Sequence, residues 1–293
     1  MPVYDLKIAD VQIRLSAEEN LTAEEQFQPF FAPCEQPDFL FRMHRTDCLP
    51  PVPDEVLYEG DCYRVHVFSG RRAVRSFFDL VRDPAPYAVC RYDYEAGTAD
   101  FYYLPRGFYA ARFFSNCIFY IGLETLMIGR KKVCMHAALI RSSAGGILFS
   151  GPSGIGKSTQ ADLWCRYDGA GLINGDRPIV GRKQGVWTGW GSPYAGSSRC
   201  YVNEEEPIAA VVFLNQAPED SVRRLNFGEA YRRIYSQLTV SPWSGDFPAR
   251  AFDTAVEMAQ EIPAYILNCT KEETAVRCLK RQLGKDRNTY ERN

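Results

Sequence analysis

Residues 145–158 read GGILFSGPSGIGKS, a short apolar run that passes into a glycine-rich stretch. The second part matches the pattern G-x-x-x-x-G-K-[ST], whose fixed positions are Gly151, Gly156, Lys157 and Ser158. Glycine lets successive backbone N–H groups turn inward around phosphate oxygens, because no Cβ blocks their approach. A helix that begins near the lysine adds the partial positive charge of its N-terminus. The run GILFS before the loop and TQADLWCR after it predict the strand and the helix that such a loop requires.

The pattern therefore predicts a binding loop for the phosphates of a nucleotide. In such a loop the lysine reaches the β- and γ-phosphates, and the hydroxyl that follows it binds Mg²⁺. We expect ATP and Mg²⁺ as cofactors. The predicted nucleotide-binding residues are Gly151, Pro152, Ser153, Gly154, Ile155, Gly156, Lys157, Ser158 and Thr159.

A second magnesium ligand is needed, and it usually follows a neighbouring buried strand. The stretch GLINGD supplies one, because Asp176 ends a short apolar run 19 residues after Lys157. This gap has room for one helix and one strand. We predict Ser158 and Asp176 as the metal ligands; the alternative is that Asp176 is only a turn residue before Pro178.

Three stretches together are specific enough to resemble a known family. MHAALI, GGILFSGPSGIGKST and LINGDRP are similar to the kinase domain of HPr serine kinase/phosphorylase and, more distantly, to the nucleotide core of phosphoenolpyruvate carboxykinase. The resemblance runs from residue 133 to about residue 215, with weaker similarity beyond, whereas the first 105 residues do not resemble the N-terminal domain of the HPr enzyme. It implies that His136, the glycine-rich loop and Asp176 form one site. The first acid of that family's Asp-Asp pair falls on Gly175, so the general base stays open between Asp176, His136 and another group.

Two further residues gain a role through this resemblance. Alone, His136 between a methionine and two alanines is typical of a buried core histidine; the resemblance implies that it orients the metal, the phosphate or the acceptor. Residues 189–203 resemble the family's loop where acceptor and phosphoryl group meet, and Arg199 is the only cation there. Arg199 either neutralises charge on the transferred group or is a solvated surface residue. Residues 241–248, SPWSGDFP, are a candidate second lid or binding loop.

Composition excludes several classes of protein. The chain has 293 residues, with 34 Lys and Arg against 36 Asp and Glu, giving a net charge of −2. This balance argues against nucleic acid or an anionic membrane as the main partner, since both require clustered positive charge. The N-terminus MPVYDLKIAD has neither the basic nor the apolar region of a secretory signal, and the ten cysteines form no C-x-x-C pair. We expect reduced, mostly buried thiols in a cytoplasmic protein.

The pattern of apolar residues changes along the chain. Up to about residue 105, alternating Tyr, Phe and Val between turn residues predict an antiparallel sheet. Residues 108–130 are apolar at helical spacing. Beyond them, short apolar runs such as VCMHAALI and PIAAVVFL predict buried strands with helices between them. We predict a β-rich domain over residues 1–125, for recognition or oligomer contacts, and a P-loop α/β kinase domain of the HPr kinase/phosphoenolpyruvate carboxykinase type over residues 126–293.

The sequence thus predicts an ATP- and Mg²⁺-dependent kinase that transfers the γ-phosphoryl group to a hydroxyl. Serine is the favoured acceptor, in a protein, a peptide or a small molecule. The predicted catalytic residues are Asp176, His136, Lys157 and Arg199. Two alternatives remain: a nucleotide-binding regulator or degenerate kinase without transfer, which Gly175 favours, and a phosphorylase acting in reverse. A homo-oligomer is compatible with the resemblance, because the resembling family forms oligomers.

Overall fold

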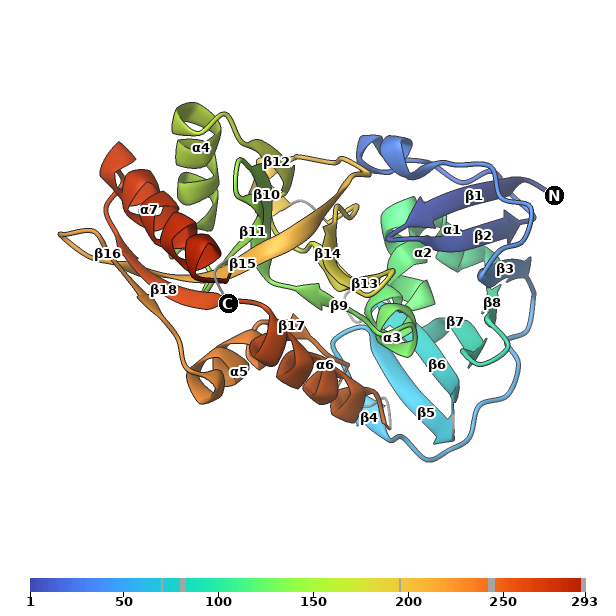
Figure 1. Ribbon diagram of the computed structural model, residues 1–293. Coiled ribbons are helices and arrows are strands. Elements are labelled where there is room, and N and C mark those ends of the chain that lie inside the picture. Colours follow the sequence, from blue (N-terminus) through green and yellow to red (C-terminus); the bar gives the residue numbers. More distant parts are fainter. Residues whose placement is uncertain (70, 80–82, 195, 242–245, 291–293) are drawn as a thin grey trace. The chain divides into compact units, whose positions relative to one another are not determined.

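The chain is a mixed α/β protein with two sheets, seen here in a computed structural model that describes residues 1–69, 71–79, 83–194, 196–241 and 246–290 (Figure 1). It divides into two compact units. The first unit comprises Met1–Arg130 and Val240–Pro248, and the second comprises Lys131–Thr239 and Ala249–Asn293. The predicted division between residues 125 and 126 falls inside a helix, Leu123–Gly129, and the return of Val240–Pro248 to the first unit has no signal in the sequence.

An eight-stranded sheet forms the first unit, in the order β1-β2-β3-β8-β7-β6-β5-β4. Every second residue of the second strand is buried, which is the side-chain period of a strand with one face on a core. The strands are β1 (Val3–Ile8), β2 (Val11–Ala17), β3 (Phe39–Arg45), β4 (Tyr58–Glu59), β5 (Tyr63–Ser69), β6 (Arg72–Asp79), β7 (Asp83–Asp93) and β8 (Thr98–Tyr103).

The prediction of an antiparallel sheet is confirmed for most strand pairs of this unit, but not for the pairs that β3 forms. Strand β3 runs parallel to both of its neighbours, β2 and β8. Parallel neighbours need a long connection, whereas antiparallel ones can be joined by a tight turn. The connection from β2 to β3 contains the short helix η1 (Glu25–Phe30), and the strands β4 to β7 lie between β3 and β8 in the chain. Turn residues mark hairpins in a sequence, but nothing local marks these parallel pairings.

The apolar stretch over residues 108–130 is helical, but it is not one helix. It follows η2 (Pro105–Gly107) and consists of α1 (Phe108–Ala111), α2 (Phe114–Ile121) and α3 (Leu123–Gly129). Phe113 is extended, with φ −91° and ψ 137°, and Gly122 is left-handed, with φ 69° and ψ 59°. These two residues interrupt the helical path. The buried residues of α2 face the sheet, where the ring of Tyr120 stacks on Phe101 at 4.5 Å between centroids.

The second unit contains a ten-stranded sheet. Its main order is β12-β10-β11-β15-β14-β13-β9-β17, and β18 pairs with both β15 and β16. The strands are β9 (Lys132–Met135), β10 (Ala137–Ser142), β11 (Gly145–Ser150), β12 (Gly171–Asn174), β13 (Ile179–Lys183), β14 (Val186–Trp190), β15 (Glu205–Gln216), β16 (Ser221–Arg224), β17 (Leu238–Thr239) and β18 (Ala264–Cys269). The helices are α4 (Lys157–Tyr167), η3 (Gly196–Ser198), α5 (Phe227–Tyr235), α6 (Phe247–Glu261) and α7 (Glu273–Tyr290).

The apolar run around His136, predicted as one strand, is two. Strand β9 pairs with β13 and β17, whereas β10 pairs with β11 and β12. His136 is the single residue between them. It therefore lies at a junction where the chain passes from one part of the sheet to another, instead of within a buried strand.

All ten cysteines are free thiols. Half of them, rather than most, are buried: Cys34, Cys90, Cys117, Cys134 and Cys269. No helix within the described residues is both long and apolar enough to cross a lipid bilayer.

Helices α4 and α7 lie side by side against one face of the second sheet (Figure 1). Trp164 of α4 is completely buried there, and its ring lies 6.2 Å from that of Phe149 on β11. The same core includes apolar residues of β15, β18 and α7. This packing fixes the helix that follows the glycine-rich stretch to the strand that precedes it.

We expect Trp164→Ala to destabilise the protein by about 3–5 kcal/mol, because it leaves a large cavity in a closely packed core. Unfolding in guanidinium chloride, followed by circular dichroism, measures this loss. Tyr167→Ala is the matched control, because Tyr167 ends the same helix with 44% of its surface exposed, and it should cost no more than about 0.5 kcal/mol. Equal losses in the two variants would contradict this description of the core.

Candidate functional site

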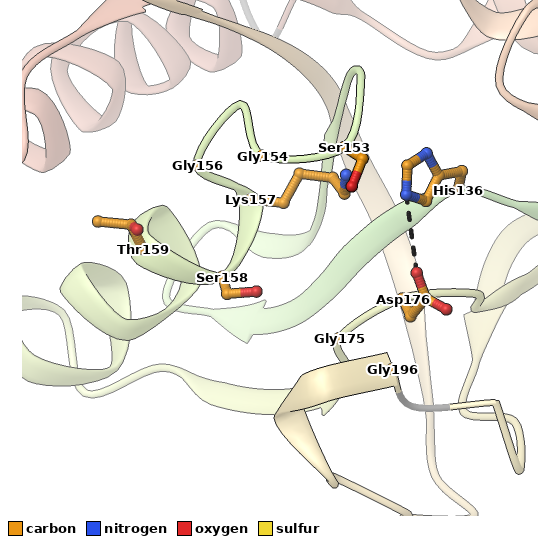
Figure 2. Close-up of a pocket in the computed structure, with 10 residues that line it drawn as sticks. All are labelled: His136, Ser153, Gly154, Gly156, Lys157, Ser158, Thr159, Gly175, Asp176 and Gly196. Carbon is orange, nitrogen blue, oxygen red and sulfur yellow. Dashed lines mark ion pairs between the residues drawn. The ribbon is translucent and has the colours of Figure 1, made fainter.

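Strand register brings three separate segments of the second unit to one edge of the sheet. Strand β10 is antiparallel to both β11 and β12, with Ala137 opposite Ser150 and Leu139 opposite Asn174. The start of β10 therefore meets the ends of its two neighbours. Together these segments border a pocket of about 280 Å³ (Figure 2). Its lining residues are His136, Ser153, Gly154, Gly156, Lys157, Ser158, Thr159, Gly175, Asp176 and Gly196.

The glycine-rich stretch forms the loop between β11 and α4. Gly154 and Gly156 have φ of 78° and 113°, where any side chain would strain the backbone, although no atom lies within 4 Å of the place that a Cβ would occupy. Ile155 points the other way and packs on the core of the unit. Six of the nine predicted nucleotide-binding residues line the pocket; Gly151, Pro152 and Ile155 do not.

Helix α4 presents its N-terminus to this loop. Its N-cap residue, Gly156, has no side chain that could accept a hydrogen bond from the first turn, and that turn contains no acidic residue. The backbone N–H groups of the first turn are therefore not capped by the N-cap side chain. Together with the helix dipole they favour an anion at this place.

Lys157 is largely buried beneath the loop, with 8% of its surface exposed. Its Nζ donates hydrogen bonds to the carbonyl oxygens of Gly151 at 3.1 Å and Pro152 at 3.3 Å. Burial lowers the pKa of the ammonium group, and the nearby Asp176 carboxylate opposes this shift. The loop thus holds a cation at the pocket wall.

His136 and Asp176 face each other across the pocket (Figure 2). Nε2 of His136 is 3.7 Å from Oδ1 of Asp176, which is too long for a direct hydrogen bond. The backbone holds the histidine: its N–H donates to the carbonyl of Gln237, and its carbonyl accepts from Ser150 Oγ, both at 2.8 Å. Burial and the positive charge of Lys157 lower the pKa of His136, while Asp176 raises it. The net lowering of the pKa favours the neutral imidazole, which can accept a proton.

Two residues that sequence reasoning missed hold Asp176 in place. The Oδ1 of Asn174, a fully buried residue, accepts the backbone N–H of Asp176 at 3.0 Å. Gly196 packs directly against the aspartate, because a Cβ at that position would lie 2.9 Å from Asp176 Cβ. For Asn174, the position of an asparagine at the end of an apolar run was a visible signal. Gly196 contacts Asp176 from a distant segment, so no local pattern marks it.

The loop between β11 and α4 has a further support that the sequence did not reveal. Nε2 of Gln216, at the end of β15, donates to the carbonyl oxygens of Gly154 and Ile155 at 3.3 Å. This contact follows from the parallel pairing of β11 and β15, which places both strand ends at the same edge. No pattern near Gln216 marks it in the sequence.

Other predicted site residues have different positions. Arg199 is exposed, has a φ of 49°, and is not among the residues that line the pocket. Ser158 and Asp176, the predicted metal ligands, both line it. No group of three or more His, Cys, Asp or Glu side chains in the described part of the chain is arranged to hold a metal, but Mg²⁺ commonly takes only one or two protein ligands besides water and phosphate. Of the candidate loop 241–248, residues 242–245 lie outside the described residues.

Residues 124–274 match the family described as SynChlorMet cassette protein ScmC. The chain belongs to this family. The ScmC match includes every residue that lines the pocket, but the description of the family names no reaction.

Comparisons with individual proteins add little. No curated protein shows significant similarity to the sequence. Among solved structures, the HPr(Ser) kinase/phosphatase from Coxiella burnetii is 13% identical, with a TM-score of 0.32; the alignment covers 54% of this chain and 96% of that one. Similarity at this level assigns neither an activity nor a detailed fold.

We predict that His136 titrates below the ordinary histidine value of 6.5, that Asp176→Asn lowers its pKa further, and that Lys157→Met raises it. The chain has three histidines, so imidazole signals in a two-dimensional NMR titration are few, and His136→Gln assigns the relevant one. His44 is an internal control, because its carboxylate partner is Asp100, at 2.9 Å. A His136 pKa that ignores both substitutions would mean that the three groups do not share one pocket.

Proposed function

We propose that this protein is an ATP- and Mg²⁺-dependent phosphotransferase that moves a γ-phosphoryl group to a hydroxyl. One observation carries the proposal: the loop 151–156, the ammonium of Lys157 and the His136–Asp176 pair surround a single pocket. Each supplies one part of phosphoryl transfer, namely a phosphate cradle, a cation and a proton acceptor. The sequence resemblance of residues 133–215 to HPr serine kinase/phosphorylase supports the same class of reaction.

The pocket suits the phosphates of a nucleotide. Backbone N–H groups of the loop and of the first turn of α4 would donate to phosphate oxygens, since that turn holds no acidic side chain to repel them. Lys157 would exchange its two carbonyl partners for β- and γ-phosphate oxygens, which are stronger acceptors because they are charged. Charge neutralisation at these oxygens is the main demand that phosphoryl transfer makes on a protein.

The donor set also suits Mg²⁺. Ser158 and Asp176 offer a hydroxyl and a carboxylate at the same pocket, both hard oxygen ligands. When bound, Mg²⁺ would neutralise charge on the phosphates. Nothing else in the proposal depends on its position.

His136 is the group that we propose to accept the proton of the acceptor hydroxyl. Its lowered pKa favours the neutral imidazole, in which one ring nitrogen carries no proton, and the 3.7 Å from Nε2 to Asp176 is too long for a direct hydrogen bond to that carboxylate. As the acceptor hydroxyl oxygen forms its bond to the γ-phosphorus, the bond between that phosphorus and the ADP oxygen breaks, and the hydroxyl proton passes to the unprotonated ring nitrogen of His136. Asp176 would stabilise the resulting imidazolium. The proposed acceptor is a serine of a protein, a peptide or a small molecule.

A second candidate is a nucleotide-binding regulator that transfers nothing. It is favoured by Gly175, which lines the pocket where the resembling family has an acid, so that Asp176 is the only carboxylate among the lining residues. The same pocket would also serve a phosphorylase, in which inorganic phosphate attacks a phosphorylated acceptor. The kinase and the phosphorylase would each convert one phosphorus-containing compound into another. The regulator would leave all of them unchanged.

We expect Lys157→Ala to weaken Mg·ATP binding about 10- to 100-fold, the loss of a charge-assisted contact, when measured by calorimetry. Asp176→Asn should keep most nucleotide affinity and lose transfer by about 100-fold or more. Phosphorus NMR with free serine, serine peptides and HPr as acceptors follows the transfer. Lys271→Ala removes an exposed lysine outside the pocket and is the matched control.

Each outcome separates the candidates. A new phosphoester signal that Asp176→Asn abolishes supports the kinase. ATP that binds and stays intact with every acceptor supports the regulator. If Lys157→Ala bound Mg·ATP as tightly as Lys271→Ala, the loop would not be the nucleotide site at all.

A further inference from the structure

One buried amide joins the turn that carries Asp176 to a second loop. Asn174 is completely buried at the end of β12. Its Oδ1 accepts the N–H groups of Asp176 at 3.0 Å and Arg177 at 2.8 Å. Its Nδ2 donates to the carbonyls of Ser192 at 3.1 Å and Tyr194 at 3.0 Å. The amide therefore uses both its acceptor and its donor capacity, one on each segment.

The second loop is itself held tightly at its base. The N–H of Gly191 donates to the carbonyl of Glu204 at 2.9 Å, and a Cβ on Gly191 would lie 1.9 Å from the carbonyl oxygen of Val202. The two ends of the loop therefore touch, and only glycine fits at this place.

Ser192, the first residue inside this loop, forms a hydrogen bond back to the 174–177 turn. It is fully buried, and its Oγ donates to the carbonyl of Arg177 at 2.7 Å. The same hydroxyl accepts the N–H of Tyr194 at 3.2 Å. The turn and the loop are thus linked by hydrogen bonds in both directions, and buried polar groups of this kind are costly to separate.

The loop also contacts the side chain of Asp176. A Cβ on Gly196 would lie 2.9 Å from Asp176 Cβ and 3.0 Å from its Cγ, and Gly196 has a φ of 54°. One side of the aspartate thus rests on the loop, while Asn174 holds its backbone. Gly196 and Asn174 together therefore set the position of the Asp176 carboxylate in the pocket.

We infer that Asn174 is a positioning residue of the phosphotransfer site: its amide joins the 174–177 turn to the segment of Ser192 and Tyr194 and thereby fixes the Asp176 carboxylate opposite His136. The expected effect on turnover rests on the proposed function. The coupling between the turn and the loop is independent of that function. Removal of the Asn174 side-chain amide should disorder the 174–177 turn locally. It should leave the glycine-rich loop unchanged, because that loop follows a different strand, β11.

The test compares wild type with Asn174→Ala, Asn174→Asp and Asn226→Ala. Asn174→Asp keeps oxygens that accept the two turn N–H groups and loses the donors to the loop. Asn226 is a matched control, because it also accepts a backbone N–H, that of Glu229 at 3.0 Å, but caps α5. Amide hydrogen exchange measured by NMR reports each N–H, and the nucleotide Kd and the transfer rate are measured separately.

In Asn174→Ala we expect exchange at Asp176 and Arg177 to accelerate about 10-fold or more, the nucleotide Kd to stay within about twofold, and transfer to fall about 10-fold or more. In Asn174→Asp the backbone N–H groups of Asp176 and Arg177 should keep their protection, whereas the backbone N–H of Tyr194 should exchange faster. Asn226→Ala should change exchange in α5 and neither amide of the turn.

Three results would overturn the inference. These are exchange at Asp176 and Arg177 equal to wild type in Asn174→Ala, acceleration spread evenly over β10, β11 and β15, or local acceleration with wild-type transfer. If wild type transfers to no acceptor, the proposed function fails, and the exchange pattern alone still decides whether Asn174 couples the turn to the loop.

Discussion

The antiparallel pairing of β10 with both β11 and β12 is the constraint on which the site depends. It brings the start of β10 to the ends of its two neighbours, so that His136, the glycine-rich loop and Asp176 share one edge although they are far apart in the sequence. Strand β10 is buried on both faces, because its consecutive residues Leu139 and Ile140 are both fully buried. A slip of one residue in either pairing would exchange side chains between two differently packed faces, so this packing also fixes where the polar groups meet.

Three charges decide what this edge can do. Lys157 and the N-terminus of α4 attract an anion, and the same positive charge disfavours protonation of His136. Asp176 acts in the opposite direction, but from 3.7 Å it does not occupy Nε2 with a hydrogen bond. In the first unit, His44 lies 2.9 Å from Asp100, so its Nε2 is already engaged. The longer separation at His136 means that Asp176 does not occupy its Nε2, which is consistent with the role of proton acceptor that we propose for this histidine.

Local features of this fold were readable from the sequence, and contacts between distant segments were not. Glycine spacing and an apolar run are local, so the strand β11, the loop and the start of α4 lie where they were expected. The break at His136, the parallel pairs of β3 and the contact of Gly196 with Asp176 all depend on register between distant strands. Arg199 shows the same limit: its place in the segment 189–203 does not determine whether it lines the pocket, and it does not.

Gly175 explains why the remaining polar groups have separate tasks. With no acid at this position, Asp176 is the only carboxylate among the described residues that line the pocket, and a carboxylate that binds a cation is a poor proton acceptor. In the proposed mechanism the proton of the acceptor hydroxyl then goes to a different group, for which we propose His136, because its imidazole faces the same pocket. A single carboxylate also needs firm placement, because no neighbour can replace it. Asn174, which uses its whole hydrogen-bonding capacity on the adjoining turn and loop, meets that need.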